Sequence, residues 1–345
     1  MNLANACPRC TVIITVYNRA EMLGEALSSV AVSRLRDLEI IVVDDGSIDG
    51  SAQIAEDFGD PRVRIIRHDQ NRGIPAARNS GLSAATGQYI AWLDSDDIAR
   101  PDRFQVQADF LDANPEIAMI GGCAGRLSKS GRRKRGARVP MLDHEDIRAQ
   151  LLFRSPFQQS SLMGRAEVLK AFPYRLSFPV CEDVDMFARL SPHHRVANLP
   201  RILVDRRLHP EQTIHLQSRH IRERKGEIFR VALASLGIDP SLDDLENHIT
   251  LGNLKSVAVG PELLQWSEKW LIGLREANHR TAIYDPRALA FVSARIWLLA
   301  VRAALRSPEP SFAMKRLMRS SLSMGLANSH GLAWLRHSAR VKLQV

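Results

Sequence analysis

Short apolar runs alternate with segments of helical spacing through the first third of the chain. Runs rich in β-branched and aromatic residues predict buried strands, and they lie at residues 11–16, 38–43, 63–66, 89–93 and 117–121. Between the runs, apolar residues recur three or four positions apart, as at Met22, Leu23, Ala26, Leu27 and Val30, which predicts helices. This order of elements predicts an α/β fold with a mostly parallel sheet and helices on both faces.

The pattern changes near residue 215, where helical spacing takes over, most clearly at 263–274 and 289–305. We therefore predict an α/β domain at residues 1–215 and an α-helical C-terminal region at 216–345. The tail, residues 302–345, has eight lysines and arginines but only one acid, Glu309. Because apolar residues are interleaved with these charges, the tail either lies on an anionic membrane surface or packs on the first domain. The sequence leaves both open.

Three carboxylates end the strand predicted at 89–93. Asp94, Asp96 and Asp97 lie within four residues and repel one another unless a positive charge sits among them. Open α/β sheets bind ligands at the carboxyl ends of their strands, and Mg²⁺ typically links one or two carboxylates to substrate phosphates. The cluster therefore predicts a metal site. The alternative is that Ser95, Asp96 and Asp97 cap the following helix.

Polar groups also follow the first two predicted strands. Thr15 and Tyr17 come at the end of the first, and Asp44 and Asp45 directly follow the second. Parallel strands bring these ends to one edge of the sheet, so we expect the groups to lie near the acid cluster.

The loop after the first strand lacks a glycine-rich phosphate motif. Neither G-x-G-x-x-G nor G-x-x-x-x-G-K occurs there, so a bound phosphate would be held by metal and arginine. Asn18 and Glu21 are spaced as a capping pair for the first helix.

Composition favours anionic partners and a reducing compartment. The net charge of +9 over 345 residues suits phosphates, nucleotides or anionic membrane surfaces. The four cysteines are too few for a disulfide scaffold, and the C-x-x-C at Cys7–Cys10 has no second pair to complete a zinc site. With no signal-peptide pattern and no apolar stretch of about 18 residues, we expect a cytoplasmic protein without a spanning helix.

A basic stretch follows the strand at 117–121. Seven lysines and arginines occur between Arg126 and Arg138 without an intervening acid. This pattern predicts a solvated hairpin, or a surface that contacts the phosphates of a lipid-linked acceptor or of anionic lipid headgroups.

Six motifs in order resemble the family 2 glycosyltransferases, which have the GT-A fold. The motifs lie at residues 13–19 (IITVYNR), 42–50 (VVDDGSIDG), 77–81 (ARNSG), 92–97 (WLDSDD), 182–185 (EDVD) and 207–209 (RLH). They fall within residues 11–215, which would then be a GT-A catalytic domain, and do not cover the C-terminal region. The resemblance implies an inverting transfer of one sugar from a nucleotide-diphospho-sugar, expected to be a UDP-sugar, to a glycan or lipid-linked acceptor in surface polysaccharide synthesis.

The resemblance also implies how the donor is held. Thr15 and Tyr17 would line the base and ribose pocket, and Asp45 would accept the imide N–H of a uracil-type base. Other positions implied on the donor side are Asn18, Asp44, Arg78, Asn79, Asp94 and Ser95.

A divalent cation, Mg²⁺ or Mn²⁺, is implied as the cofactor. Asp94 and Asp96 match the D-x-D motif of the family, with Asp96 expected to contact the metal and Asp94 to contact the ribose or the metal's water shell. His209 matches a position that ligates the metal or touches the diphosphate; the alternative is a polar loop histidine.

The family's general base matches Asp183. Glu182 and Gln159 are implied on the acceptor side, although Gln159 stands where many relatives have histidine. Glu182 and Asp183 also open a helical pattern, where the helix dipole alone favours carboxylates. The Gln-x-x-Arg-Trp signature of processive synthases is absent, which favours addition of a single sugar. Since we also expect no spanning helix, we expect the protein in the cytoplasm or on the inner face of the cell membrane.

Two other functions fit parts of the sequence. A sugar nucleotidyltransferase would share the layered fold and the metal carboxylates, but usually has a glycine-rich basic loop after the first strand. A nucleic-acid-binding protein would explain the charge, but the basic residues lie mainly in one hairpin and the tail, without aromatic platforms on strands. We therefore expect no nucleic-acid partner.

Overall fold

The computed structural model describes residues 7–209, 217–254, 257–307 and 310–342, which divide into two compact units. The first, the α/β unit, contains residues up to 140, residues 157–217 and those from 340 onward. The second, the helical unit, contains residues 141–156 and 218–339. The predicted boundary at 215–216 lies outside the described residues. Residues 141–156, inside the predicted first domain, group with the helical unit because α5 (His144–Leu151) packs against α12 (Pro286–Ala304).

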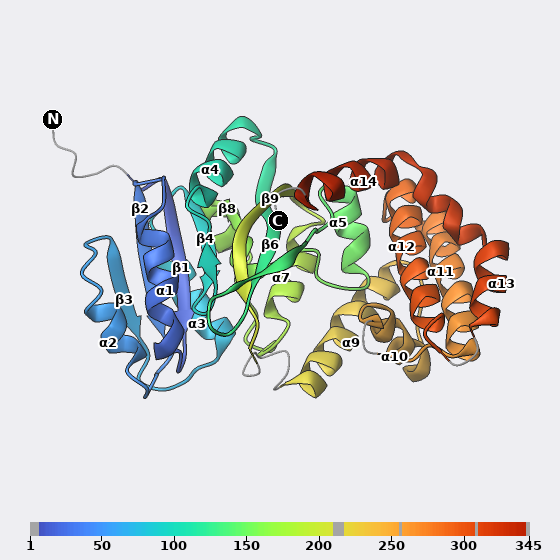
Figure 1. Ribbon diagram of the computed structural model, residues 1–345, viewed down its shortest axis with the longest axis horizontal. Helices are drawn as coiled ribbons and strands as arrows, with labels where there is room; N and C mark the ends of the chain where they lie inside the picture. The colour runs from blue at the N-terminus through green and yellow to red at the C-terminus, as the bar shows by residue number, and fades with distance from the viewer. Residues whose placement is uncertain (1–6, 210–216, 255–256, 308–309, 343–345) are drawn as a thin grey trace. The chain divides into compact units, whose positions relative to one another are not determined.

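A mixed sheet forms the centre of the α/β unit (Figure 1). Four neighbouring parallel strands form one side of it, in the order β3 (Val63–Arg67), β2 (Leu38–Asp44), β1 (Cys10–Val16) and β4 (Tyr89–Asp94). The sheet continues through β8 (Met163–Arg165), β6 (Ile117–Leu127), β9 (Arg195–Arg207) and β5 (Ile98–Ala99), and β7 (Arg133–Arg138) pairs with β6. The predicted α/β fold is confirmed.

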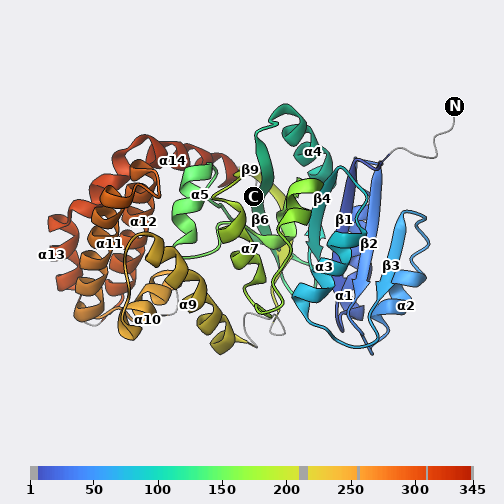
Figure 2. The same cartoon turned by 180° about the vertical axis from the view of Figure 1, so that it is seen from behind.

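Helices cover both faces of this sheet, as the alternating side chains of β1 require. Val12 and Ile14 pack in the core with α1 (Ala20–Ala31) and α4 (Arg103–Ala113). Ile13 points to the other face, where α3 (Ile74–Ala84) approaches so closely that a Cβ on Gly81 would lie 2.5 Å from the Ile13 Cγ2 atom. Figure 2 shows α3 from this side. The shorter helices of the unit are α2 (Ser51–Glu56), the 3₁₀ turn η1 (Gln159–Ser161), α6 (Ala166–Ala171) and α7 (Glu182–Leu190).

The start of α1 differs from the prediction. The helix begins at Ala20, and Asn18 has a positive φ of 50°. The Asn18 side-chain oxygen accepts the backbone N–H of Ile48 at 2.9 Å, whereas Asp49 accepts the N–H of Ala20 at 3.0 Å. The predicted Asn18–Glu21 capping pair is therefore wrong, because the loop after β2 caps this helix.

The C-x-x-C sequence does not form a paired site. Cys7 is exposed and its thiol donates to the backbone oxygen of Thr86, while Cys10 is fully buried in β1. Burial raises the pKa of the Cys10 thiol to about 12, so this side chain is an inert part of the core.

The helical unit is built from amphipathic helices, coloured yellow to red in Figure 1. They are α9 (Ser218–Ser235), α10 (Leu242–Leu251), α11 (Pro261–Thr281), α12, α13 (Ser311–Arg319), the 3₁₀ segment η3 (Ser321–Ala327) and α14 (Ser329–Lys342). The predicted helical patterns at 263–274 and 289–305 correspond to α11 and α12. The tail packs within this unit through α13 and η3, which contact α11 and α12; Glu309 lies outside the described residues. Within the described ranges, no helix combines the length and apolar character that a membrane crossing requires.

A buried histidine sits at the centre of the helical unit. His248 is fully buried; its Nε2 lies 2.6 Å from the backbone oxygen of Leu152 and its Nδ1 lies 2.9 Å from the indole N–H of Trp270. Trp270 donates to Nδ1, so the ring is neutral with its proton on Nε2. Burial lowers the pKa of His248 to about 4.

Because His248 is buried in its neutral form, we predict that the folded protein loses stability in mild acid. The folded-state pKa of about 4 lies below the ordinary value of 6.5, so the stabilisation is present above pH 6.5 and is lost as the pH falls toward 4. Between pH 7 and pH 5 we expect the free energy of unfolding to fall by about 2 kcal/mol more in wild type than in His248→Gln. Urea titrations followed by tryptophan fluorescence measure this. The exposed-histidine variant His279→Gln should keep the wild-type pH dependence; equal losses in wild type and His248→Gln would contradict the assignment.

Candidate active site

The carboxyl ends of β1, β2 and β4 meet at one edge of the sheet. The strand register places Val16 beside Asp44 and Thr15 beside Asp94. Thr15 is half-buried, and Tyr17 beyond the strand end is 44% exposed. The three strand ends that the sequence singled out are therefore neighbours in space.

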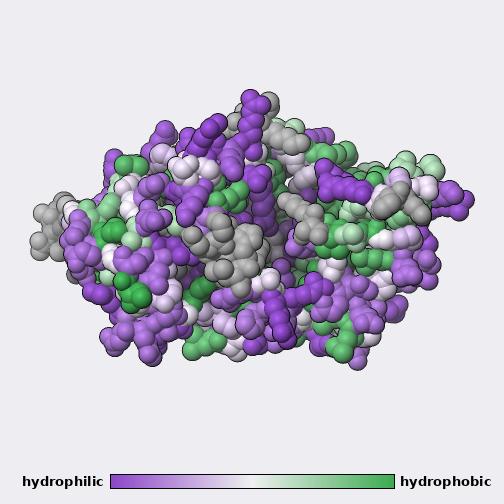
Figure 3. All heavy atoms as spheres, turned by 60° about the horizontal axis from the view of Figure 1, so that its bottom comes forward, coloured by the Kyte–Doolittle hydropathy of each residue, from purple (hydrophilic) through white to green (hydrophobic). Residues whose placement is uncertain are grey.

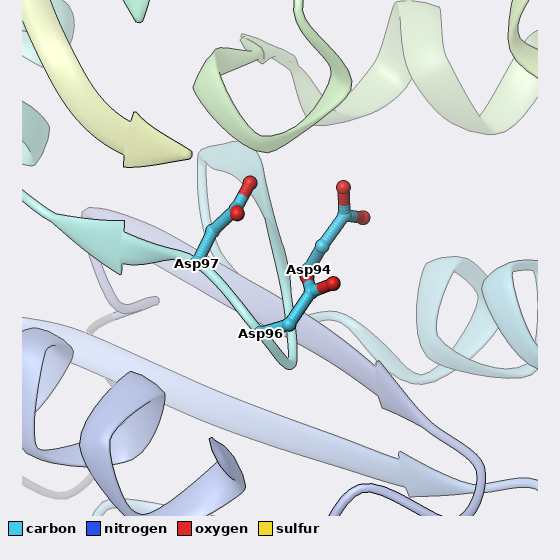
Figure 4. A group of neighbouring side chains, drawn as sticks. All are labelled: Asp94, Asp96 and Asp97. Carbon is cyan, nitrogen blue, oxygen red and sulfur yellow. The ribbon is translucent and has the colours of Figure 1, made fainter. Parts of the chain in front are cut away.

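The acid cluster lies on the turn between β4 and β5. One carboxylate oxygen from each of Asp94, Asp96 and Asp97 lies within 4.8 Å of the others, and Figure 4 shows the three side chains grouped on one side of this turn. The turn is closed by the Asp97 N–H, which donates to the Asp94 backbone oxygen at 3.1 Å. Since α4 begins only at Arg103, the alternative that Ser95, Asp96 and Asp97 cap the next helix is wrong.

The end of β9 fixes this turn from the other side. The backbone N–H of Arg207 donates to Asp97 Oδ1 at 2.9 Å, and its guanidinium Nε donates to the Asp96 backbone oxygen at 3.0 Å. His209 Nε2 lies 2.8 Å from Asp96 Oδ2, and the His209 side chain is buried. His209 was predicted at the site, whereas Arg207 was not given a role of its own, because its contacts with the acid turn are long-range and leave no local signal in the sequence.

The electrostatics of the cluster favour a bound cation. Burial, and then the neighbouring Asp94, raise the pKa of Asp96; burial, and then the Asp96 and Asp94 charges, raise the pKa of Asp97 well above its usual range. Asp97 is 1% exposed and already accepts a backbone N–H, whereas the side chains of Asp94 and Asp96 are 35% and 17% exposed. Carboxylate oxygens in this arrangement suit a hard divalent cation, with Asp94, Asp96 and His209 as the available ligands.

A buried arginine links the acid cluster to helix α7. Arg78, on α3, has one guanidinium nitrogen 2.5 Å from Glu182 Oε1 and the other 3.5 Å from Asp94 Oδ1. It lies against the rings of Trp92 and Tyr174. Burial raises the pKa of Glu182 to about 7 against the opposing effect of Arg78. Breaking a buried ion pair of this kind typically costs about 3–5 kcal/mol, so the pair holds the start of α7 beside the cluster.

Asp183 lies in the first turn of α7, next to Glu182. Its side chain is half-buried, and Oδ1 accepts the N–H of Val184 at 2.8 Å. The dipole of α7 stabilises Glu182 and Asp183 in its first turn, which is the alternative explanation for their position. Because Arg78 contacts both Glu182 and Asp94, however, the start of α7, which carries Asp183, also lies beside the acid cluster.

The loop after β2 is held by a chain of polar side chains. Asp45 is buried; Oδ1 lies 2.6 Å from His68 Nδ1, and its oxygens accept the N–H groups of Arg72 and Gly73 at 2.9 Å. His68 Nε2 lies 2.9 Å from the Ser80 hydroxyl on α3. His68 was not predicted, because it follows β3 as a single histidine without a motif.

Asp44 is also buried, and its Oδ1 accepts the N–H of Ser47 at 3.2 Å. Asn18 joins the same loop, since its N–H donates to the Ser47 hydroxyl at 3.0 Å. Ser95 is buried within the acid turn. These contacts bring Asn18, Asp44 and Asp45 together at the loop after β2.

Tyr174, which was not predicted, contacts Arg78, Asn79 and Gln159. The Asn79 side-chain amide binds the backbone of Tyr174 twice. Its nitrogen donates to the Tyr174 backbone oxygen at 2.8 Å, and its oxygen accepts the Tyr174 backbone N–H at 2.9 Å. Gln159 is buried and donates to the Tyr174 hydroxyl at 3.0 Å, while its Oε1 has no hydrogen-bond partner among the described residues. Asn79 thus has a scaffold role that the sequence did not predict, and Gln159 keeps a free acceptor.

The basic stretch forms the β6–β7 hairpin. The side chains between Arg126 and Arg138 that carry charge are exposed, and Arg126 faces Lys134 across the strand pair. Arg133 is anchored by the buried Asp205 at 3.1 Å. The hairpin is confirmed, and its contact with phosphates stays a prediction.

Comparison with known proteins agrees with this geometry. A family model described as glycosyl transferase family 2 matches residues 11–172. An uncharacterized glycosyltransferase of Haemophilus influenzae is 31% identical over 252 residues, covering 68% of this chain and 77% of the relative. The amylovoran biosynthesis glycosyltransferase AmsE of Erwinia amylovora is 29% identical over 231 residues, covering 65% of this chain and 85% of AmsE.

Solved structures show the same fold. S. aureus TarS (residues 1–349), in complex with UDP-GlcNAc, aligns with a TM-score of 0.58 at 16% identity over 90% of this chain and 92% of that one. The mannosyltransferase PcManGT of Pyrobaculum calidifontis, in complex with GDP-Man and Mn²⁺, aligns with a TM-score of 0.51 at 17% identity over 97% and 87%. The fold is that of the GT-A enzymes.

Taken with its fold and site, the chain is a glycosyltransferase enzyme, and it belongs to glycosyltransferase family 2. This membership decides against the sugar nucleotidyltransferase alternative.

Proposed function

We propose that the protein transfers one sugar, with inversion, from a nucleotide-diphospho-sugar to a hydroxyl of a glycan or lipid-linked acceptor. The observation that carries this proposal is the ion-paired bridge of Arg78, which holds the start of α7, with Asp183, beside the acid cluster. A cation-binding cluster and a carboxylate on a separate helix are the two parts that a single displacement at an anomeric carbon needs.

A Mg²⁺ or Mn²⁺ ion would be held by Asp96, Asp94 and His209. When bound, it would neutralise the charge that develops on the leaving diphosphate. The fit rests on the short distances within the cluster and on the raised pKa of Asp96, which burial and Asp94 cause. The neighbouring PcManGT structure, which contains GDP-Man and Mn²⁺, supports this cofactor.

The donor base would bind beside β1 and the loop after β2, on Thr15 and Tyr17. Asp45 would take part through Oδ2, which accepts one hydrogen bond, from Gly73, and retains capacity for a base imide N–H. Asn18, Asp44 and Ser95 shape the surrounding loops. We propose a UDP-sugar, a choice supported by the UDP-GlcNAc bound to TarS.

Asp183 would act as the general base. The acceptor oxygen attacks the anomeric carbon, the bond from that carbon to the diphosphate oxygen breaks, the acceptor proton passes to Asp183, and the electron pair leaves with the nucleoside diphosphate. Glu182 keeps Arg78 in place on the acceptor side, and Gln159, anchored on the Tyr174 hydroxyl, is the second residue proposed on that side.

We place this activity in polysaccharide biosynthesis, in the cytoplasm or at the inner face of the cell membrane. The support is the similarity to AmsE, an amylovoran biosynthesis glycosyltransferase. The β6–β7 hairpin is the candidate contact for phosphates of a lipid-linked acceptor.

The stereochemistry of donor hydrolysis tests the proposal without knowledge of the acceptor. Water serves as the acceptor for UDP-glucose, UDP-galactose, UDP-GlcNAc or GDP-mannose, and proton NMR identifies the anomer formed first. From an α-linked donor we expect the β-anomer, only when Mn²⁺ or Mg²⁺ is present. First formation of the α-anomer, or equal rates with a chelator, would overturn the proposal.

A further inference from the structure

We propose that helix α13 is a contact surface for anionic membrane lipids. Its outward side, which we call the α13 face, carries Met314, Lys315, Met318 and Arg319. This inference goes beyond the proposed transfer reaction and does not depend on it, because α13 belongs to the helical unit and the acid cluster belongs to the α/β unit.

The inner side of α13 fixes its orientation. Ala313 is fully buried, Ser320 just beyond the helix is buried, and α13 contacts α11 and α12. The Arg316 guanidinium lies 2.5 Å from Glu268 Oε2 on α11, whose side chain is 16% exposed. A helix tied down by a buried small residue and an ion pair presents one constant side to the solvent.

That outward side is divided into an apolar half and a cationic half. Met314 and Met318 are spaced four residues apart and are 45% and 76% exposed. Lys315 and Arg319 have the same spacing, are exposed, and lie one position further round the helix. Residues four apart lie on one side of a helix, so a stripe of two methionines runs beside a stripe of two cations.

Neither stripe is satisfied within the described part of the chain. Arg316 has its carboxylate, but no carboxylate among the described residues lies within ion-pair distance of Lys315 or Arg319. The sequence has no acid from residue 310 to residue 345. On the face shown in Figure 3, hydrophilic residues prevail and hydrophobic residues form separate patches.

The occupant that fits both stripes is a lipid surface with negative headgroups. A helix lying in such a surface buries its apolar stripe among the acyl chains while its lysines and arginines meet the headgroups. Unbranched methionine side chains adapt readily to a fluid partner. Further exposed apolar residues in the same acid-free segment are Met324, Leu332 and Leu335. An acidic protein would satisfy the cations but would not need the methionine stripe.

Vesicle co-sedimentation of the full-length protein tests the proposal. Wild type should bind vesicles of phosphatidylcholine with phosphatidylglycerol, and bind much less to phosphatidylcholine alone or at high salt. Met314→Ser with Met318→Ser, and separately Lys315→Gln with Arg319→Gln, should each weaken binding by about tenfold or more. The matched control is Leu242→Ser: Leu242 is 76% exposed, like Met318, but stands beside Asp243 and Asp244. This control should bind as wild type does.

Each outcome decides the question. Circular dichroism and the rate of donor hydrolysis should be unchanged in both double variants, so a failure here is separate from a failure of the proposed function. Absence of wild-type binding to anionic vesicles, or equal binding by wild type and both double variants, would overturn the proposal. Binding to poly-glutamate that needs only Lys315 and Arg319, without vesicle binding, would point to an acidic protein instead.

Discussion

Replacing Asp183 with asparagine is expected to lower the rate of donor hydrolysis and sugar transfer by about 10²–10⁴-fold, the usual contribution of a general base. The amide keeps the size of the carboxylate and its hydrogen bond from the Val184 N–H, so the start of α7 should keep its structure. Only the ability to accept the acceptor's proton is removed. Nucleotide affinity should therefore stay within about twofold of wild type, because the nucleotide is assigned to other residues.

The matched control for this variant is Asp185→Asn on the same helix. Asp185 is buried and ion-paired with Arg189 at 2.9 Å, so its carboxylate is engaged within the helix. Its replacement should reduce stability and leave turnover of the folded enzyme near that of wild type. If Asp183→Asn retains near-normal turnover, or if both variants lose activity alike, Asp183 is not the base.

The second large effect is expected at Asp96. Asp96→Asn removes one negative charge from the proposed metal site and weakens the contact of residue 96 with His209. Loss of a direct ligand should exceed the roughly 10–100-fold loss in metal affinity that is typical for outer-shell partners. Nucleotide binding that depends on Mn²⁺ should then fall below detection in calorimetric titrations.

Asp97→Asn is the control for that change. Asp97 is the most buried acid of the cluster, its pKa is raised well above the usual range by burial, and its Oδ1 accepts the Arg207 N–H. An asparagine keeps that oxygen, so metal-dependent binding should largely persist. Equal losses in Asp96→Asn and Asp97→Asn would show that the cluster acts through its total charge and not through the ligands assigned here.

The strand ends that form the site were predictable because their signals are local. An apolar run followed directly by acids marks both a buried strand and its polar end, as in Ala91 to Asp97. The parallel order predicts that these ends share one edge of the sheet, and the observed register places Thr15 beside Asp94. The role of Asp183, by contrast, came from family resemblance, since its position in a helical first turn has a structural explanation of its own.

Residues that act through distant partners could not be predicted. His68 and Tyr174 stand in no pattern, and their importance appears only when Asp45, Ser80 and Asn79 are brought next to them. The predicted capping pair was wrong for the same reason: Asp49, from the loop after β2, accepts the N–H of Ala20 at the start of α1. Local periodicity encodes elements and their ends; the pairing of side chains across elements depends on the tertiary fold.

The same limit applies to the tail. Its sequence left two locations open, and neither described how α13 is fixed. The contact of Arg316 with Glu268 decides which side of the helix faces outward, and that side carries the methionines and unpaired cations. The amphipathic pattern was visible in the sequence, whereas its direction required the fold.

We propose that the acid cluster holds the donor, whereas Asp183 accepts the proton of the acceptor. One calorimetric series tests it directly: titration of UDP, in the presence of Mn²⁺, into wild type, Asp96→Asn and Asp183→Asn. We predict binding to wild type and to Asp183→Asn with similar affinity, and no measurable binding to Asp96→Asn. Unchanged binding to Asp96→Asn, or loss of binding in Asp183→Asn, would contradict it.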